Sequence, residues 1–370
     1  MDSRGGPTEQ LENPFLSDAE VREFLAQVSR RFKERPFKVH PLFSGGHAQT
    51  LGAYAWPRRH RFQRFSKLDG HRLFEVEPGV QVLAHCRWQS RPSEAPTVIL
   101  WHGIEGSTAS VYMISTADKA FRAGYNVLRV NFRNCGGTEH LTPTLYHGGL
   151  SGDLKAIINE LITKDGLKRI YAIGFSLGGN VVLKLAGELG DSGGRELAAI
   201  CAISPSVDLA ASTELILQKR NWLYHGNFVR NLKRRVRTKH KFFPGRYDLS
   251  KLIAVRTIRD FDEHFTSVAN GFLNADDYYY RCSSIRVAEN IRVPTLIIHS
   301  EDDPFIPFDP LREAAFAKNP YILLIATESG GHVAFLGAKG SGEDRFWAEN
   351  RAVEFCVLVE RWLATTSESF

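Results

Sequence analysis

Ser176 has the surroundings that a nucleophilic serine needs. It lies at the centre of residues 174–178, which read Gly-Phe-Ser-Leu-Gly between a short apolar run and a helix-compatible run. In a strand–turn–helix context, the two glycines remove side chains that would clash at the turn. The serine then stands above a helix N-terminus, whose free N–H groups favour a developing negative charge. We interpret Ser176 as a nucleophile, although a glycine-rich turn between core elements is the simpler alternative.

A serine hydroxyl is a poor nucleophile near neutral pH, so it needs a base, and the base needs an acid to orient it. After a strand–turn–helix serine, the acid and then the histidine follow along the chain. His332, in a glycine-rich loop after a strand-like run, is the expected base. The acid is ambiguous between Asp302 and Asp303. We prefer Asp303, because related hydrolases often carry a proline four residues after the aspartate and Pro307 has that spacing. Asp302 is the fallback, and one of the two carboxylates is available to cap the turn.

The same chemistry needs backbone donors for an oxyanion. One usually belongs to the residue after the nucleophile and the other to a loop after an earlier strand. These residues are Leu177 and, within the run His-Gly-Ile-Glu-Gly-Ser at 102–107, Ile104. Losing one such donor costs about 3 kcal/mol of transition-state stabilisation. His102 comes too early in the chain order to be the base, so we expect a structural role for it.

Composition is that of an ordinary globular chain. The chain has 370 residues, of which 43% are apolar and 24% charged, and its formal net charge is +6. Its five cysteines lack CxxC spacing, which argues against a disulfide framework or a zinc site and for a reducing compartment. The N-terminus has no apolar signal region, and no stretch approaches the roughly 18 apolar residues of a membrane span. We expect no metal and a cytoplasmic location that leaves peripheral membrane contact open.

Strand-like and helix-like segments alternate along most of the chain, which predicts an α/β fold with a mostly parallel central sheet and helices on both faces. Residues 61–88 alternate as strands do, with turns at 68–70 and 78–79. We expect an N-terminal arm over 1–60 packed on the body, a core of 61–205 plus 286–370, and a helical lid inserted over 206–285. Further strands are expected near 97–101, 127–132, 169–174, 197–204, 293–299 and 321–326, and helices near 17–34, 111–124, 150–164, 177–189, 310–318 and 345–364.

The expected lid contains a basic stretch. Residues 215–247 include no acidic residue, and aromatic and aliphatic side chains are interleaved with the cations. Such a stretch is typical of a helix on an anionic membrane surface. The interleaving fits equally well a solvated outer face with the aromatic side chains turned inward. No recognised nucleic-acid motif accompanies the charges, so we expect no nucleic-acid partner. The cations are Lys219, Arg220, Arg230, Lys233, Arg234, Arg235, Arg237, Lys239, Lys241 and Arg246.

These motifs together resemble the YheT-like branch of the α/β-hydrolase superfamily, a group of esterases and acylglycerol lipases. The resemblance covers roughly residues 36–335. It rests on Gly-Phe-Ser-Leu-Gly-Gly-Asn at 174–180, His-Pro at 40–41, Gly-Gly-His-x-Gln-Thr-Leu at 45–51, His-Gly-Ile-Glu-Gly-Ser at 102–107, Asn-Phe-Arg-Asn-Cys at 131–135, Tyr-His at 146–147, Thr-Ile-Arg-Asp-Phe-Asp at 257–262, Gly-Phe at 271–272, Tyr-Tyr at 278–279, His-Ser-Glu-Asp-Asp-Pro at 299–304 and Gly-Gly-His at 330–332.

The resemblance implies a lidded α/β-hydrolase fold, carboxylic-ester cleavage and no cofactor. We expect a serine esterase or lipase that acts on medium-chain acyl esters or acylglycerols through an acyl-enzyme. Two alternatives remain open: an acyltransferase that uses an alcohol acceptor, and a non-catalytic membrane-surface binding protein on the same fold.

Overall fold

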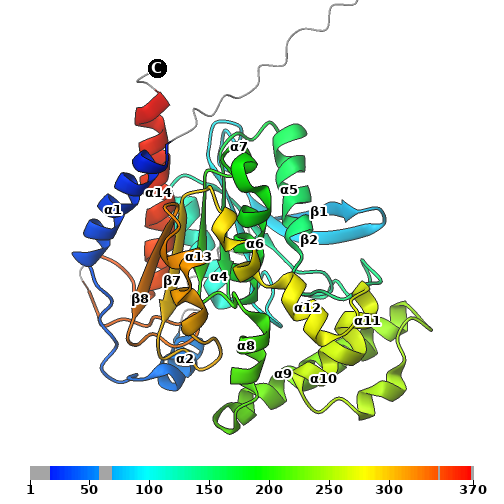
Figure 1. The fold of residues 1–370 in the computed structure, drawn as a ribbon. Coiled ribbons are helices and arrows are strands. Elements are labelled where there is room, and N and C mark those ends of the chain that lie inside the picture. Colours follow the sequence, from blue (N-terminus) through cyan, green and yellow to red (C-terminus); the bar gives the residue numbers. More distant parts are fainter. Residues whose placement is uncertain (1–16, 58–68, 341, 368–370) are drawn as a thin grey trace, which may run out of the picture.

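The structure is a computed structural model that describes residues 17–57, 69–340 and 342–367. Eight strands form one sheet in the order β1-β2-β4-β3-β5-β6-β7-β8 (Figure 1). The strands β1 and β2 pair with each other in the antiparallel direction, β2 pairs antiparallel with β4, and the remaining pairs are parallel. The strands are β1 (Gly70–Glu77), β2 (Val80–Arg87), β3 (Thr97–Trp101), β4 (Asn126–Val130), β5 (Ile170–Phe175), β6 (Ala199–Ile203), β7 (Thr295–Ser300) and β8 (Ile322–Thr327).

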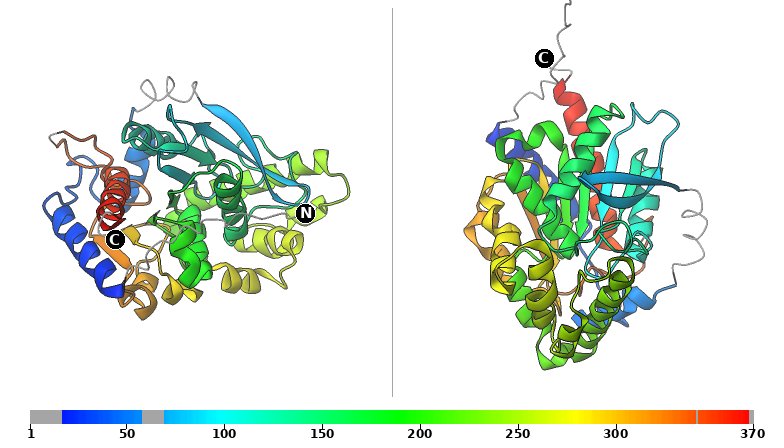
Figure 2. Two further views of the ribbon diagram at one scale, coloured as in Figure 1. Left: turned by 90° about the horizontal axis from the view of Figure 1, so that it is seen from above. Right: turned by 90° about the vertical axis from the view of Figure 1, so that its right-hand side faces the viewer.

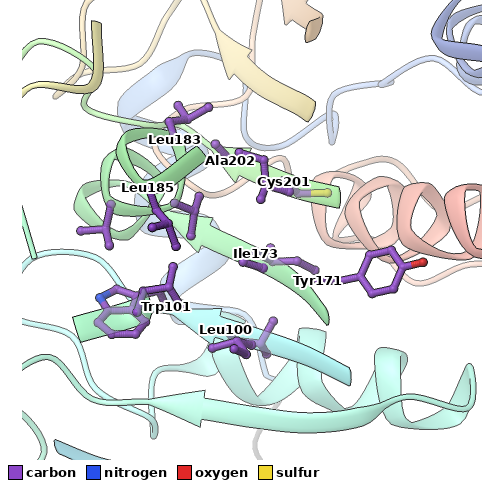
Figure 3. Close-up of a cluster of buried hydrophobic side chains, with 14 of the residues drawn as sticks. Leu100, Trp101, Tyr171, Ile173, Leu183, Leu185, Cys201 and Ala202 are labelled. Carbon is purple, nitrogen blue, oxygen red and sulfur yellow. The ribbon is translucent and has the colours of Figure 1, made fainter. Parts of the chain in front are cut away.

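The central strands are continuous apolar runs because both of their faces are covered. Every residue of β3 to β7 is buried, whereas β8, at the edge, is only partly buried. Figure 3 shows side chains of three neighbouring strands, among them Leu100, Ile173 and Ala202, packed together with Leu183 and Leu185 of the helix that follows β5. The central strands are therefore covered on both faces, and the loops that follow them lie at the strand ends.

Helices cover both faces of the sheet (Figure 2). On one face α4 and α1 both pack against α14, and on the other face α5 packs against α6. The helix α1 begins with a capping box between Ser17 and Glu20. These helices are α1 (Asp18–Lys33), α4 (Val111–Arg122), α5 (Ser151–Thr163), α6 (Leu177–Leu189) and α14 (Trp347–Ser367). Short helices join them: η1 (Gly190–Ser192), α7 (Gly193–Glu196), η7 (Asp309–Arg312) and α13 (Ala314–Ala317).

Two segments differ from the expected elements. The helix expected near 310–318 is divided into η7 and α13, because Glu313 between them has an extended backbone with φ −62° and ψ 152°. The expected arm contains α1 and a second helix, α2 (Gly46–Ala55). Residues 1–16 and 58–68, which include parts of the arm and the turn at 68, lie outside the described residues.

Between β6 and β7 the described chain is helical and contributes most of an apolar cluster that includes Val236 and Phe261. Figure 1 shows these helices gathered at the end of the molecule opposite the marked C-terminus. No helix in the described ranges is long and apolar enough to cross a membrane. The inserted helices are α8 (Leu209–Ile216), η2 (Lys219–Asn221), α9 (Trp222–Phe242), η3 (Leu249–Ile253), α10 (Ile258–Phe261), the π-helix η4 (Asp262–Thr266), α11 (Ser267–Asn270), α12 (Ala275–Cys282), η5 (Ser284–Arg286) and η6 (Ala288–Asn290).

Candidate active site

Ser176 occupies a strained turn between β5 and α6. Its backbone has φ 53° and ψ −118°, and its N–H donates to the carbonyl oxygen of Ile203 at 2.9 Å. A side chain at either glycine would collide with backbone: a Cβ on Gly174 would lie 2.2 Å from the oxygen of Gly178, and one on Gly178 would lie 2.3 Å from the oxygen of Trp101. The glycine spacing is therefore a steric requirement of this turn, and it places Ser176 where β5 ends.

His332 and Asp303 form a hydrogen-bonded pair. The imidazole Nδ1 lies 2.8 Å from Asp303 Oδ2, and the other carboxylate oxygen accepts the N–H groups of Phe305 at 2.8 Å and Ile306 at 3.1 Å. Burial alone would raise the pKa of Asp303, but its charge interaction and hydrogen bond with His332 outweigh burial and hold that pKa below its ordinary value. The carboxyl is thus ionised at neutral pH and fixes the proton of His332 on Nδ1.

Asp302 has a different place. Its Oδ1 accepts the backbone N–H groups of Gly330 and Gly331, each at 2.9 Å. These bonds shape the loop that carries His332, and neither carboxylate oxygen of Asp302 bonds the imidazole. Of the two carboxylates that sequence reasoning left open, Asp303 is the one beside the histidine.

The helix α2 supports the histidine loop, a role that the sequence did not reveal. Thr50 Oγ1 accepts the backbone N–H of His332 at 2.9 Å, and the Gln49 side chain bonds the N–H of Leu336 at 2.7 Å and its carbonyl at 3.1 Å. A Cβ on Gly46 would lie 1.8 Å from the carbonyl oxygen of Asp302, so only glycine fits there. The sequence indicated the run at 45–51 only as part of a family resemblance, and nothing in it connected this run with the distant loop at 330–336.

The loop after β3 approaches the serine closely. A Cβ on Gly103 would lie 3.0 Å from Ser176 Cβ, which explains a glycine there. His102 is fully buried, with Nδ1 2.7 Å from the oxygen of Gly103 and Nε2 accepting the N–H of Phe132 at 3.0 Å. Burial lowers the pKa of His102 to about 4, so the ring is neutral and both nitrogens are engaged. It holds the loop in shape, as expected.

Two cavities meet at Ser176. The outer cavity, of about 500 Å³, is also lined by His332, Ile104, Phe305 and Tyr224. The inner cavity, of about 70 Å³, is lined by Ser176 and by Ile104 and Leu177, the two residues expected to supply oxyanion donors. The structure therefore brings all five expected site residues, with Asp303 behind His332, to one place.

The inner cavity is mostly apolar but includes a polar cluster. Asp262, at the start of η4, accepts hydrogen bonds from Thr266 Oγ1 and Tyr279 Oη, each at 2.7 Å. Burial raises the pKa of Asp262 to about 6, against the effect of these two hydrogen bonds. Sequence reasoning singled out Asp262 only as part of a family motif. Asp262 begins a π-helical turn, and such turns often occur at functional sites. The local backbone therefore gives one structural reason to assign Asp262 a function.

The cations of the basic stretch differ in burial, and Lys233 is half-buried. Arg235 and Lys239 of α9 are turned into the protein, where Lys239 Nζ contacts the carbonyl oxygens of Glu139 and Thr142. Neither can face a membrane. The exposed cations are Lys219, Arg220, Arg230, Arg234, Arg237, Lys241 and Arg246.

Within the described chain, no group of three or more His, Cys, Asp or Glu side chains could hold a metal ion. His47, which could be mistaken for a ligand, stacks on Tyr224 with ring centres 5.7 Å apart. This contact brings α2 beside the start of α9.

Comparisons with known proteins identify the family. Residues 96–338 match the family described as alpha/beta hydrolase fold. The chain is 29% identical to the putative esterase YheT of Escherichia coli over 88% of its own length and 92% of that protein. It is also 29% identical to the medium-chain fatty acid ethyl ester synthase/esterase 2 of Saccharomyces cerevisiae, over 72% of its own length and 62% of that protein.

Among solved structures, the esterase Pf2001 of Pyrococcus furiosus aligns with a TM-score of 0.52 and 17% identity, over 80% of this chain and 93% of that one. This similarity concerns the fold alone. The matches confirm the expected sheet architecture and the expected family. The chain belongs to the alpha/beta hydrolase fold family, and within that family it groups with the YheT-like esterases and lipases.

Proposed function

We propose that the protein is a serine carboxylic-ester hydrolase that acts on medium-chain acyl esters or acylglycerols through an acyl-enzyme. The observation that carries the proposal is that Ser176 and His332 line the same cavity while Asp303 holds the far nitrogen of the imidazole. Nucleophilic catalysis by a serine requires a base beside the hydroxyl and an acid that orients the base, and the shared cavity and the Asp303–His332 pair support these roles.

The proposed reaction has two halves. His332 Nε2 takes the proton of Ser176, whose Oγ forms a bond to the ester carbonyl carbon, and the N–H groups of Ile104 and Leu177 bind the oxyanion. The bond from carbon to the leaving oxygen then breaks, and His332 returns the proton to the departing alcohol. Water, deprotonated by the same imidazole, attacks the acyl-enzyme and releases the carboxylic acid with the serine restored.

The two cavities fit the two halves of an ester. His332 lines only the outer cavity, so the alcohol that it protonates departs on that side. The acyl chain then occupies the inner cavity, which begins at Ser176 and is lined by aliphatic side chains such as Leu209 and Ile216 together with aromatic and polar ones. The preference for medium acyl chains is supported by the yeast relative, which is named a medium-chain fatty acid ethyl ester synthase/esterase. The segment 206–285 supplies most of the wall of the inner cavity and a smaller part of the outer one, and would act as a lid.

The direct test is hydrolysis of a medium-chain p-nitrophenyl ester by the wild type, Ser176→Ala and His332→Ala. Each variant should lose several orders of magnitude in kcat with similar effects, because the two residues act as a unit. Full activity in Ser176→Ala would end the proposal. A catalytically silent wild type that still binds lipid would favour the non-catalytic alternative.

An acyltransferase is the second candidate, and one comparison favours it: the yeast relative is named both a synthase and an esterase of ethyl esters. The first half-reaction is the same, and an alcohol replaces water in the second. Adding ethanol or glycerol to the assay and separating the products distinguishes the two. Ester products formed faster than free acid would establish transfer, and free acid alone would exclude it.

We also propose peripheral contact with an anionic membrane. The outer cavity is lined in part by α2 and α9, and on these two helices Leu51, Tyr54, Trp222 and Leu223 are 55%, 79%, 68% and 64% exposed. Cations near an anionic surface add about 1 kcal/mol each and lose this with salt. Vesicles with anionic lipid should sediment the wild type more than a variant with Arg220, Arg230, Arg234 and Arg237 changed to Gln, and only at low salt. If both proteins stay in the supernatant, there is no such contact.

The five cysteines, all free and buried, support a reducing, cytoplasmic compartment.

A further inference from the structure

The inward-facing Arg235 reaches the loop that carries the proposed oxyanion donor. Its guanidinium makes a two-pronged ion pair with Glu105, the residue after Ile104: Nε lies 3.1 Å from Oε1 and Nη2 lies 3.2 Å from Oε2. Both side chains are nearly buried, with 10% of Arg235 and 7% of Glu105 exposed. A fork of this kind fixes orientation as well as distance, which a lysine cannot do. The inserted helix α9 is thereby tied to the loop between β3 and α4.

Glu105 is held in an unfavourable backbone conformation. Its φ of 54° lies in the left-handed region, which costs a residue with a Cβ about 1 kcal/mol and persists only where the surroundings enforce it. Tyr146 contributes to this, since its hydroxyl accepts the N–H of Glu105 at 3.1 Å and donates to Glu105 Oε1 at 2.8 Å. The loop conformation that places Ile104 therefore depends on contacts made by the Glu105 side chain.

Arg235 is itself anchored from several sides. Its Nη1 donates to the carbonyl oxygen of Asn134 and lies 3.7 Å from Glu139, and its guanidinium carbon stands 5.4 Å from the ring centre of Tyr146. Arg235 also lines the inner cavity with Ser176 and Ile104. A movement of α9 would carry the guanidinium with it and change the support of Glu105.

We propose that Arg235 is a positioning residue: through Glu105 it sets the backbone N–H of Ile104 toward the oxyanion, and so makes the catalytic strength of the site depend on the seating of α9. The inference rests on the proposed function, because it needs an oxyanion at Ser176. An oxyanion donor must be in place before the negative charge develops. A displacement of the loop therefore destabilises the transition state, whereas ground-state binding of the substrate in the two cavities is retained.

The test compares Arg235→Lys, which keeps the charge and loses the fork, with Lys239→Gln. Lys239 is the matched control because it is the other inward cation of α9 and contacts the 139–142 segment instead of the oxyanion loop. Steady-state kinetics with a medium-chain p-nitrophenyl ester, and the dissociation constant of an alkyl boronic acid that mimics the tetrahedral state, are measured alongside thermal unfolding. Arg235→Lys should lower kcat by about 10- to 100-fold with KM changed less than threefold, and boronic-acid affinity should fall by a similar factor.

Lys239→Gln should leave kcat and boronic-acid affinity within threefold of the wild type even where the unfolding midpoint falls. If Arg235→Lys does not fold, the isosteric Glu105→Gln decides and should show the same split between kcat and KM. Unchanged kcat in a folded variant overturns the inference, and so does a loss confined to KM. The proposed function fails on a different result: either the wild type does not hydrolyse the ester, or Ser176→Ala leaves the hydrolysis intact.

Discussion

Replacing Asp303 with Asn tests the acid–histidine pair, because it changes which nitrogen of His332 carries the proton while the side chain keeps its shape. One side-chain oxygen of Asp303 accepts two backbone N–H groups, from Phe305 and Ile306, while the other faces His332 Nδ1 at 2.8 Å. An asparagine keeps its carbonyl oxygen on the two N–H groups, so its NH₂ must face the imidazole. Nδ1 then has to accept a hydrogen bond, and the ring proton moves to Nε2, where the serine proton should be received.

The wrong tautomer of a triad histidine costs about 10⁴ in kcat. We expect Asp303→Asn to lose that factor in hydrolysis of a medium-chain p-nitrophenyl ester at neutral pH, with little change in KM. Asp302→Asn is the matched control: its carbonyl oxygen can keep the N–H groups of Gly330 and Gly331, so kcat should change less than tenfold. A larger loss in Asp302→Asn than in Asp303→Asn would refute this reasoning and transfer the acid to Asp302.

Three further outcomes follow from the site. Because an unfolded aspartate titrates near pH 4 and the pKa of buried Asp262 is about 6, the folded state binds more protons between these values and stability falls as pH rises through them. Unfolding by urea should show Asp262→Asn gaining up to roughly 3 kcal/mol relative to the wild type at pH 8 compared with pH 4; an equal difference at both pH values would show that the carboxyl does not titrate there. Gly103→Ala should lower kcat more than tenfold, since the new Cβ would lie 3.5 Å from Ser176 Oγ, whereas Gly152→Ala, with open space around it, should be neutral; equal activity of the two would argue against a tight approach at Gly103. Across p-nitrophenyl esters of increasing length, kcat/KM should be higher for medium chains than for acetate, and a steady decline from two carbons upward would indicate a small polar substrate instead.

The sequence predicted the elements that depend on local pattern. Continuous apolar runs located the parallel strands, and the Gly-x-Ser-x-Gly spacing placed Ser176 at the junction of β5 and α6, which begins at Leu177 as expected. The prediction of one continuous helix near 310–318 was wrong, because one extended residue, Glu313, separates η7 from α13. A break of that kind leaves no mark on hydrophobic periodicity.

What the sequence could not show depends on contacts between distant residues. Asp302 and Asp303 are neighbours, and only the folded loop reveals that one bonds glycine N–H groups and the other the imidazole. Thr50 supports His332 across 282 positions of the chain. Likewise, interleaved cations and aromatic residues fit two orientations of α9, and packing against Glu105 selects the inward one for Arg235.

The measurement that tests the central claim most directly is the site of covalent labelling by an alkyl fluorophosphonate. The reagent phosphonylates an activated serine and needs neither a known substrate nor turnover. Intact mass followed by peptide mapping should find one adduct, on Ser176, with labelling abolished in Ser176→Ala and much slower in His332→Ala. An adduct at another residue, or an unlabelled wild type, would contradict the account.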